Sequence, residues 1–236
     1  MARPEKFSAG SDPREASRQQ VVSVIRAAGQ IARIDIAQET GVSPATVTAI
    51  TAELIRAGLI EEVSPESAPS TPGRGRPRVS LRLRGAAHVL AGIKVSSGTI
   101  STILIDFDGT TLSEHMSPLP KARMAPEALT ERIVDTLKAA AAETGRKIAD
   151  LSGLGVGISG MVDVSEGLVH WSPSLTRRNV ALRDMLETAL PMPVFLDNDA
   201  NSVAKAEQLF GEGRGVRDFL VVTIEHGVGL GIVIDG

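Results

Sequence analysis

The chain has 236 residues, 42% of them hydrophobic, and a formal net charge of −3. This length allows one or two domains, and the apolar content is sufficient for a buried core. The absence of cysteine excludes disulfides and thiolate metal sites. No long apolar run or secretory signal is present, which favours a cytoplasmic protein without a membrane partner.

The charge is unevenly distributed along the chain. Residues 1–85 contain 12 Lys and Arg against 9 Asp and Glu, whereas residues 86–236 contain 13 against 19. The first part therefore carries +3 and the second part −6. Because basic residues neutralise phosphates, the first part is the one expected to bind nucleic acid.

A first helix is expected over about residues 15–28, after a leader of residues 1–14 that we expect to be disordered. Apolar residues recur in it at helical spacing, namely Val21, Val22, Ile25 and Ala28. Gly29 is suited to end this helix. A short second helix is expected next, with an apolar side formed by Ile34, Ile36 and Ala37.

A tight turn and a third helix follow. Gly41 suits a left-handed turn because it has no Cβ, Ser43 is a typical N-cap, and Pro44 is favoured at the first helical position. One face of the third helix is expected to be buried: Val47, Ile50, Thr51 and Leu54. The other side carries small residues: Ala45, Thr46, Thr48, Ala49 and Ala52.

The small outer face distinguishes this helix from an ordinary exposed helix, which would carry Lys, Glu and Gln. Small side chains let a helix approach base edges, and Ala or a Thr methyl group can contact the thymine methyl group. The pattern predicts a DNA-reading helix-turn-helix; the alternative is a three-helix bundle with a poorly charged face. The residues expected to contact bases or phosphates are Arg33, Ser43, Ala45, Thr46, Thr48 and Ala49.

Strands predicted at residues 59–63 and 79–83 would form the wing of a winged helix-turn-helix domain, residues 15–85. The loop between them contains Arg74-Gly75-Arg76-Pro77, which resembles the core of an AT-hook. Glycine keeps such a loop thin, and arginine can enter a narrow A/T-rich minor groove. We therefore expect Arg74 and Arg76 to contact DNA; the alternative is a common basic loop.

From His88 the pattern changes to that of an α/β domain, residues 86–236. Strands are expected at 89–95, 99–106, 111–116, 151–158, 193–196, 218–224 and 229–234, and helices at 126–144, 181–189 and 201–210. Three strands followed by alternating helices and strands fit one lobe of an actin-like (ribonuclease-H-like) ATPase fold.

Four segments of this domain, in order and at matching spacing, resemble the ROK family. They are G-V-G-I-S-G-M-V-D (155–163), W-S-P-S-L (171–175), P-V-F-L-D-N-D-A-N-S-V-A-K-A-E (193–207) and G-V-G-L-G-I-V-I-D-G (227–236). The family contains sugar kinases and sugar-responsive repressors of the xylose-repressor and N-acetylglucosamine-repressor type. The repressors add an N-terminal winged helix, and a homodimer or tetramer is the family expectation.

Kinases of this family hold ATP phosphates in two glycine-rich turns, where backbone N–H groups approach oxyanions. The first turn, Asp-x-Gly-Gly-Thr in the family, is replaced here by Lys94-Val95-Ser96-Ser97-Gly98. The second, Gly-Thr-Gly-x-Gly, is replaced by Glu225-His226-Gly227-Val228-Gly229. A carboxylate about 4 Å from a phosphate charge is repelled by about 4 kcal/mol at an effective dielectric of about 20.

We therefore expect a non-enzymatic regulator without a catalytic residue. In the alternative, a sugar kinase with an appended DNA-binding domain, Asp199 would be the general base. A third hypothesis is a module that binds DNA without any effector.

The resemblance implies a sugar pocket that contains Gly160, Ser174, Asn198 and Asp199. Without chemistry, the carboxylate of Asp199 can still accept a hydrogen bond from a sugar. The alternative is that Asp197 and Asp199 only cap the following helix. His170 and Trp171 could stack on a sugar, although core packing is the stronger expectation.

The family pattern continues beyond the point that matches Gly236, with a second lobe that carries further sugar contacts and a Cys/His zinc motif. We therefore expect an incomplete ATPase-fold lobe, either a natural short form or a truncation, that holds no metal or other cofactor. The apolar strands within 218–234 would then lack sheet partners, which favours aggregation. The expected partners are double-stranded operator DNA and a sugar effector.

Overall fold

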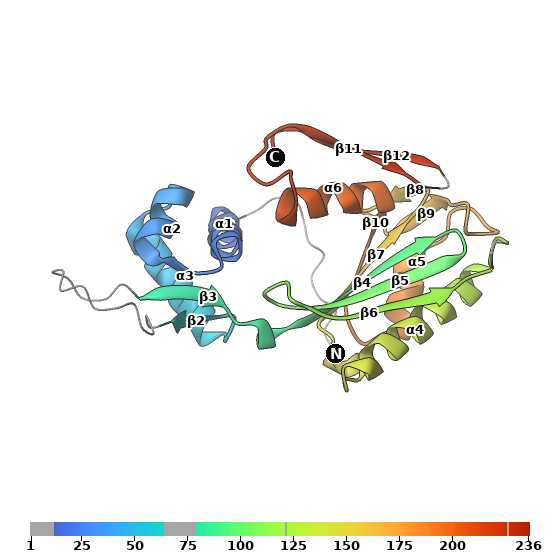
Figure 1. Ribbon diagram of the computed structural model, residues 1–236, viewed down its shortest axis with the longest axis horizontal. Helices are drawn as coiled ribbons and strands as arrows, with labels where there is room; N and C mark the ends of the chain where they lie inside the picture. The colour runs from blue at the N-terminus through green and yellow to red at the C-terminus, as the bar shows by residue number, and fades with distance from the viewer. Residues whose placement is uncertain (1–11, 64–78, 121, 226) are drawn as a thin grey trace. The chain divides into compact units, whose positions relative to one another are not determined.

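The computed structural model describes residues 12–63, 79–120, 122–225 and 227–236 (Figure 1). The chain divides into two compact units, residues 1–87 and 88–236. The division lies two residues beyond the expected one, because the short 3-10 turn Gly85–Ala87 belongs to the first unit. Within the described ranges, none of the helices combines the length and apolarity that crossing a bilayer requires.

The N-terminal unit is a winged helix-turn-helix. Its described elements are α1 (Pro13–Ala28), β1 (Ile31–Ala32), α2 (Arg33–Thr40), α3 (Pro44–Arg56), β2 (Ile60–Val63) and β3 (Ser80–Leu83). Strand β3 pairs antiparallel with both β1 and β2. Buried side chains from the three helices and the sheet form its core: Val21, Ile25, Ile36, Val47, Ile50, Leu54, Ile60 and Leu81. Strand β1 was not expected, because two residues carry no periodicity.

Three details of this unit differ from the expectation. Helix α1 begins at Pro13, because the Asp12 side chain caps it by accepting the Arg14 N–H at 3.0 Å. Pro13 and Arg14 therefore belong to the helix and Asp12 is its N-cap, whereas the rest of the expected leader lies outside the described residues. Ala28 and Ile34 are exposed, since the short helix α2 turns Ile36 and Ala37 toward the core instead.

The C-terminal unit is built on a mixed sheet with the strand order β10-β7-β4-β5-β6. Its described elements are β4 (Val89–Ser96), β5 (Thr99–Asp106), β6 (Thr111–Pro118), α4 (Pro126–Glu143), the 3-10 turn η2 (Ile148–Asp150), β7 (Gly153–Ile158), β8 (Met161–Asp163), β9 (Leu168–Trp171), α5 (Leu182–Ala189), β10 (Val194–Asn198), α6 (Asp199–Phe210), β11 (Phe219–Ile224) and β12 (Val228–Val233). Strand β7 runs parallel to β4 and β10, whereas β4, β5 and β6 form an antiparallel meander. The hairpin β8–β9 was not expected.

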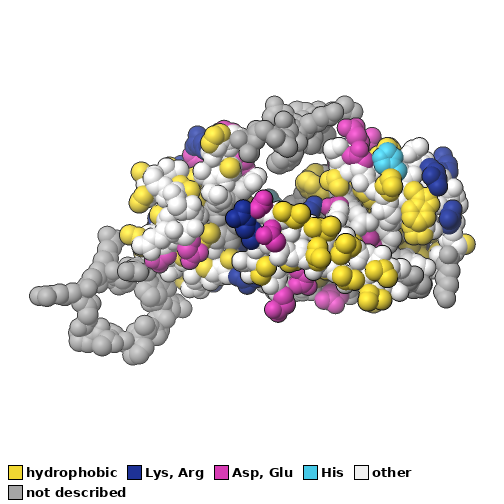
Figure 2. Space-filling model, turned by 90° about the horizontal axis from the view of Figure 1, so that it is seen from above, with side chains coloured by type: hydrophobic (Ala, Val, Ile, Leu, Met, Phe, Trp, Pro, Cys, Tyr) yellow, Lys and Arg dark blue, Asp and Glu magenta, His cyan; other side chains and the backbone are white. Residues whose placement is uncertain are grey.

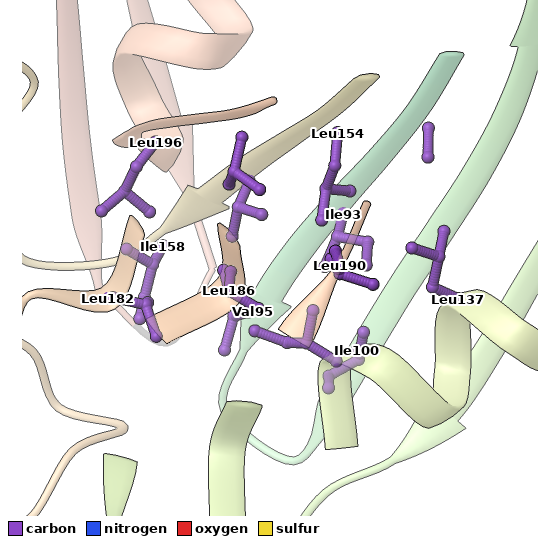
Figure 3. Packing of buried hydrophobic residues seen from close by; sticks show 14 of the residues in the cluster. Ile93, Val95, Ile100, Leu137, Leu154, Ile158, Leu182, Leu186, Leu190 and Leu196 are labelled. Carbon is purple, nitrogen blue, oxygen red and sulfur yellow. The ribbon is translucent and has the colours of Figure 1, made fainter. Parts of the chain in front are cut away.

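Helices α4 and α5 cover one face of the sheet, and α6 lies on the other (Figure 1). Buried and less buried residues alternate along β4 and β5, as expected for strands with one core face. In Figure 3, Ile93, Val95, Leu154 and Ile158 of the sheet meet Leu137 of α4 and Leu182, Leu186 and Leu190 of the α5 segment. Aliphatic side chains therefore fill a core that has few aromatic residues.

The hairpin β11–β12 packs on α6. A Cβ at Gly231 would lie 2.6 Å from the Cβ of Ala204, so only glycine permits this approach. The opposite face of the hairpin is apolar and exposed: Leu220, Val222, Ile224, Val228, Leu230 and Ile232. Figure 2 shows this patch of hydrophobic side chains. The two strands pair with each other and, among the described residues, with no further strand.

Candidate functional site

Helix α3 presents the predicted small face to solvent. Val47, Ile50, Thr51 and Leu54 are buried, as expected. Ser43 is the N-cap, and its Oγ accepts the Thr46 N–H at 3.2 Å. The predicted DNA contacts of this segment are all exposed: Ser43, Ala45, Thr46, Thr48 and Ala49. The surface needed for approach to a groove is therefore present.

The hydroxyl groups of this face are held within the helix. Thr48 Oγ1 donates to the Pro44 carbonyl at 2.8 Å, and the hydroxyls of Ser43 and Thr46 lie 2.8 Å apart. The hydroxyl proton of Thr48 is therefore already used in a hydrogen bond to the backbone. Its methyl group and the lone pairs of its oxygen remain available to a ligand. These groups suit a thymine methyl contact and a base amino group.

Arg33 has a different environment from the one expected. Its Nε donates to Thr51 Oγ1 at 3.1 Å, and its Nη2 donates to Glu62 Oε1 at 2.7 Å. The side chain therefore ties α2 to α3 and β2. A phosphate contact would require breaking the pair with Glu62, so Arg33 acts first as a structural link. Arg74 and Arg76 lie outside the described residues.

The predicted sugar residues meet where the parallel strands β7 and β10 end. Asn198 Nδ2 donates to the Gly160 carbonyl at 2.8 Å, which joins the turn after β7 to the end of β10. Gly160 has φ +130°, and a Cβ there would lie 2.1 Å from the Trp171 carbonyl oxygen. Glycine is therefore required for this close approach. Ligands of α/β proteins commonly bind outside such strand ends.

Asn198, and not the two aspartates, caps helix α6. Its Oδ1 accepts the N–H groups of Ala200 and Asn201 at 2.8 and 3.3 Å. Asp197 instead accepts from Lys205 Nζ at 2.5 Å. With its oxygen in the cap and one amide proton on Gly160, Asn198 retains one N–H for a ligand. The N-cap is therefore Asn198; of the two aspartates named in the capping alternative, only Asp199 accepts a helix N–H, that of Ala200 at 3.0 Å.

Asp199 begins helix α6, and its half-buried carboxylate accepts a hydrogen bond from the hydroxyl of Ser159. Sequence reasoning missed Ser159, although it lies next to Gly160 in a motif already singled out. The Ser159 contact holds one carboxylate oxygen in place. The other oxygen accepts the Ala200 N–H at 3.0 Å, and it keeps a lone pair that could accept a further hydrogen bond.

Ser174 lies on the loop that follows Trp171. Its N–H donates to Ser172 Oγ at 3.1 Å, and its carbonyl accepts the Met124 N–H at 2.9 Å. Ser172 contacts Gly160, so this loop lies beside the same strand ends. The structure thus brings together the strand ends that carry Gly160, Asn198 and Asp199 and the loop that carries Ser174.

Trp171 does not pack in the core, contrary to the expectation. It is 38% exposed, because it ends strand β9 at the surface. His170 is half-buried, and its Nδ1 lies 2.9 Å from Asn179 Oδ1. At the other end of this hairpin, hydrogen bonds from the Ser165 hydroxyl and the Glu166 N–H lower the pKa of Asp163.

A salt bridge joins the two segments that the sequence analysis compared with the kinase turns. Lys94 of β4 pairs with Glu225, which follows β11. Among the described residues, no group of His, Asp and Glu is arranged to hold a metal ion.

Comparison with known proteins identifies both units. The ROK family model matches residues 90–236, and a winged helix-turn-helix DNA-binding model matches residues 14–61. The DNA-binding transcriptional repressor Mlc of Escherichia coli K12 is 30% identical over 217 residues, which cover 92% of this chain and 52% of Mlc. A xylose repressor of Caldicellulosiruptor bescii is 29% identical over 205 residues, which cover 87% of this chain and 50% of the repressor.

Solved structures that match the chain belong to the same family as these relatives. A ROK family transcriptional regulator, described as a homolog of the E. coli MLC protein, matches with a TM-score of 0.74 and 30% identity over 94% of this chain and 55% of its own. A ROK family glucokinase from Streptomyces griseus matches with a TM-score of 0.55 and 29% identity over 62% of this chain and 45% of its own. The chain belongs to the ROK family, and it spans about half the length of the curated relatives it matches.

Proposed function

We propose that this member of the ROK family is a sugar-responsive transcriptional repressor. The observation that carries the proposal is the joint presence of an exposed small-residue face on α3 and a second unit in which Gly160, Asn198 and Asp199 meet at the ends of β7 and β10. The relatives that match both units are named as a DNA-binding transcriptional repressor and a xylose repressor.

Helix α3 would read the major groove. Ala45, Thr48 and Ala49 would approach base edges, while Ser43 and the start of the helix would lie near phosphates. Arg74 and Arg76 would enter the flanking minor groove. A homodimer, or a tetramer built from dimers, would bind half-sites about one helical turn or a multiple apart.

A sugar bound among Gly160, Ser174, Asn198 and Asp199, the proposed sugar cleft, would act as the effector. Asp199 and the remaining N–H of Asn198 would bind hydroxyl groups, and Ser174 would close the site from its loop. A sugar alters operator affinity only if it binds differently to the DNA-competent and DNA-incompetent arrangements. The proposed effector therefore changes the relative placement of two DNA-binding units in an oligomer.

The Lys94–Glu225 pair argues against the kinase alternative. An ATP phosphate would have to displace Lys94 from Glu225 and then face the uncompensated carboxylate. Asp199 would keep its position, but no ATP would be bound to supply the phosphoryl group. We propose that the chain is not an enzyme and that Asp199 is a sugar acceptor.

The test is fluorescence anisotropy with the 236-residue chain and duplexes selected by that chain from a random-sequence library. We expect selective binding that weakens with salt and changes with one of the panel sugars glucose, xylose and N-acetylglucosamine. Replacing Arg74 and Arg76 together with Ala should reduce the slope of log affinity against log salt by about 2. No sequence preference in the selected duplexes would overturn the regulator proposal.

A kinase assay tests the alternative that the chain is a sugar kinase. We expect no sugar-dependent ATP hydrolysis from the wild-type chain. Sugar-dependent turnover that is lost in Asp199→Asn would overturn the non-enzymatic assignment. Selective DNA binding that no sugar alters would leave the DNA-binding role and remove the effector role.

A further inference from the structure

The hairpin β8–β9 forms one wall of a hollow outside the cleft described above. The hollow has a volume of about 470 Å³ and is lined by Met161, His170, Trp171, Arg178 and Asn179. In Figure 2, hydrophobic, histidine and basic side chains gather at the end of the unit where Figure 1 places β8 and β9. Pockets of a few hundred cubic ångströms are typical of small-molecule sites.

Two large apolar side chains face solvent at this hollow. Met161 is 65% exposed and Trp171 is 38% exposed, and the two are paired across the hairpin. The register shifts between Met161 and Val162, and such bulges re-aim side chains next to binding sites. Trp171 is the single tryptophan of the sequence. An exposed indole beside a thioether is a surface suited to stacking.

Polar groups complete the hollow. Asn179 has φ +53°, an uncommon conformation for a residue other than glycine, and its Oδ1 lies 2.9 Å from His170 Nδ1. The exposed Arg178 has no acidic partner among the described residues, whereas its neighbour Arg177 pairs with Glu127. The hollow therefore offers a flat apolar surface together with hydrogen-bond donors that suit neutral hydroxyl groups.

The hollow adjoins the residues of the proposed sugar site. Met161 directly follows Gly160, whose carbonyl accepts from Asn198, and the Trp171 backbone contacts the Gly160 position. The loop that carries Ser174 also carries Arg178 and Asn179. It folds back along β9 through the bond from the Val180 N–H to the Val169 carbonyl, 2.9 Å long. One glycine and one loop thus belong to both sites.

We infer that this hollow is a second saccharide subsite, in which Trp171 stacks on a sugar ring linked to the one bound in the cleft. The inference rests on the proposed sugar-effector function. Sugars present apolar ring faces and equatorial hydroxyls, which match an indole plane flanked by Arg178 and Asn179. The effector class is therefore a disaccharide or a longer glycoside, and Trp171 is the specificity residue.

The experiment compares each monosaccharide with its disaccharide: glucose with cellobiose, xylose with xylobiose, and N-acetylglucosamine with chitobiose. Calorimetry gives affinities, and emission from the single tryptophan reports occupancy of the hollow. For one pair we expect tighter disaccharide binding and a change in emission that the monosaccharide does not cause. Trp171→Ala should weaken disaccharide binding about tenfold and monosaccharide binding less than about twofold.

Matched variants separate stacking from folding. Trp171→Phe keeps an aromatic plane and should retain much of the disaccharide affinity. Leu220→Ala truncates a large apolar residue of β11 that is exposed outside the hollow and away from Asp199, and it should leave both affinities unchanged. Equal loss for both sugars in Trp171→Ala would overturn the subsite, because it would indicate a general structural role.

The remaining outcomes are also decisive. Binding of monosaccharides without any disaccharide would overturn this inference and leave the proposed function intact. Displacement of the disaccharide by an acidic peptide such as hexaglutamate, lost in Arg178→Ala, would assign the hollow to a protein partner and overturn the inference. Failure of every saccharide would remove the effector function, and the DNA-binding assay would then show which part of the proposed function survives.

Discussion

Helices α3 and α6 use the same kind of residue in opposite ways. Both begin at a side-chain N-cap, Ser43 in α3 and Asn198 in α6, and both carry alanines spaced four residues apart. In α3, Ala45 and Ala49 are exposed, because bulky aliphatic residues occupy the opposite face.

In α6 the alanines are covered instead. Ala200 and Ala204 are buried beneath the hairpin β11–β12, which approaches them through Gly229 and Gly231. Small residues therefore permit close approach in both helices. The approaching partner differs between the two helices. Over α6 it is a strand pair of the same unit, and over α3, in our proposal, it is a DNA groove. A stripe of small residues indicates close contact without identifying the partner.

The largest expected effect is on DNA affinity. Ala49→Glu places a carboxylate on the open face of α3, where it would meet phosphates and base edges. We expect at least a hundredfold weaker binding to a selected duplex, about 2.7 kcal/mol, with the melting temperature nearly unchanged. Anisotropy and thermal unfolding measure the two effects.

The control for that variant is Ser23→Glu, which adds the same charge at an exposed position of α1. It should reduce DNA affinity far less. Equal losses in the two variants would show a general charge effect and would remove α3 as the reading helix.

The next effect is on stability at α6. Gly231→Ala puts a Cβ 2.6 Å from the Cβ of Ala204 and 2.8 Å from the Ala200 carbonyl oxygen. Overpacking of this kind costs about 1–3 kcal/mol, so urea unfolding should show a lower midpoint for the C-terminal unit. Gly227→Ala is the matched control, because a Cβ there has no neighbour within 4 Å among the described residues. If both variants unfold alike, the hairpin does not pack as described.

The two caps should differ in a third experiment. Ser43→Ala removes a cap from α3 and should cost about 1 kcal/mol. Asn198→Ala should cost more, because it removes the cap of α6 and also the donor to the Gly160 carbonyl. Asn198→Asp keeps the acceptor of the cap but loses the donor to the Gly160 carbonyl. Its stability cost should lie between those of Ser43→Ala and Asn198→Ala. Equal costs for the Ala and Asp variants at Asn198 would contradict a role for the Gly160 bond.

The smallest effect concerns the Lys94–Glu225 pair, which joins the hairpin turn to β4. Both side chains are partly exposed, so a double-mutant cycle with Lys94→Met and Glu225→Gln should give a coupling of about 0.2–1 kcal/mol that declines with salt. A coupling that is absent at low salt would mean that glycine–alanine packing alone holds the hairpin on α6.

The order and type of most elements, and their local chemistry, could be predicted from the sequence. The Ser43 cap, the left-handed Gly41 and the buried face of α3 follow from rules that act within a few residues. The α/β layout followed from strand and helix periodicities and, through the ROK motifs, from resemblance. The proximity of Gly160 and Asn198 was implied in the same way.

The partner that each side chain meets depends on the folded chain and could not be predicted. Arg33 binds Glu62 across 29 positions, Lys94 binds Glu225 across 131, and Ser159 binds Asp199 across 40. Trp171 is exposed because the hairpin β8–β9 carries it to the surface. This hairpin is too short to show the two-residue periodicity of a strand in the sequence. Local propensity extends over a turn or a strand, whereas these pairings depend on how the sheet brings distant segments together.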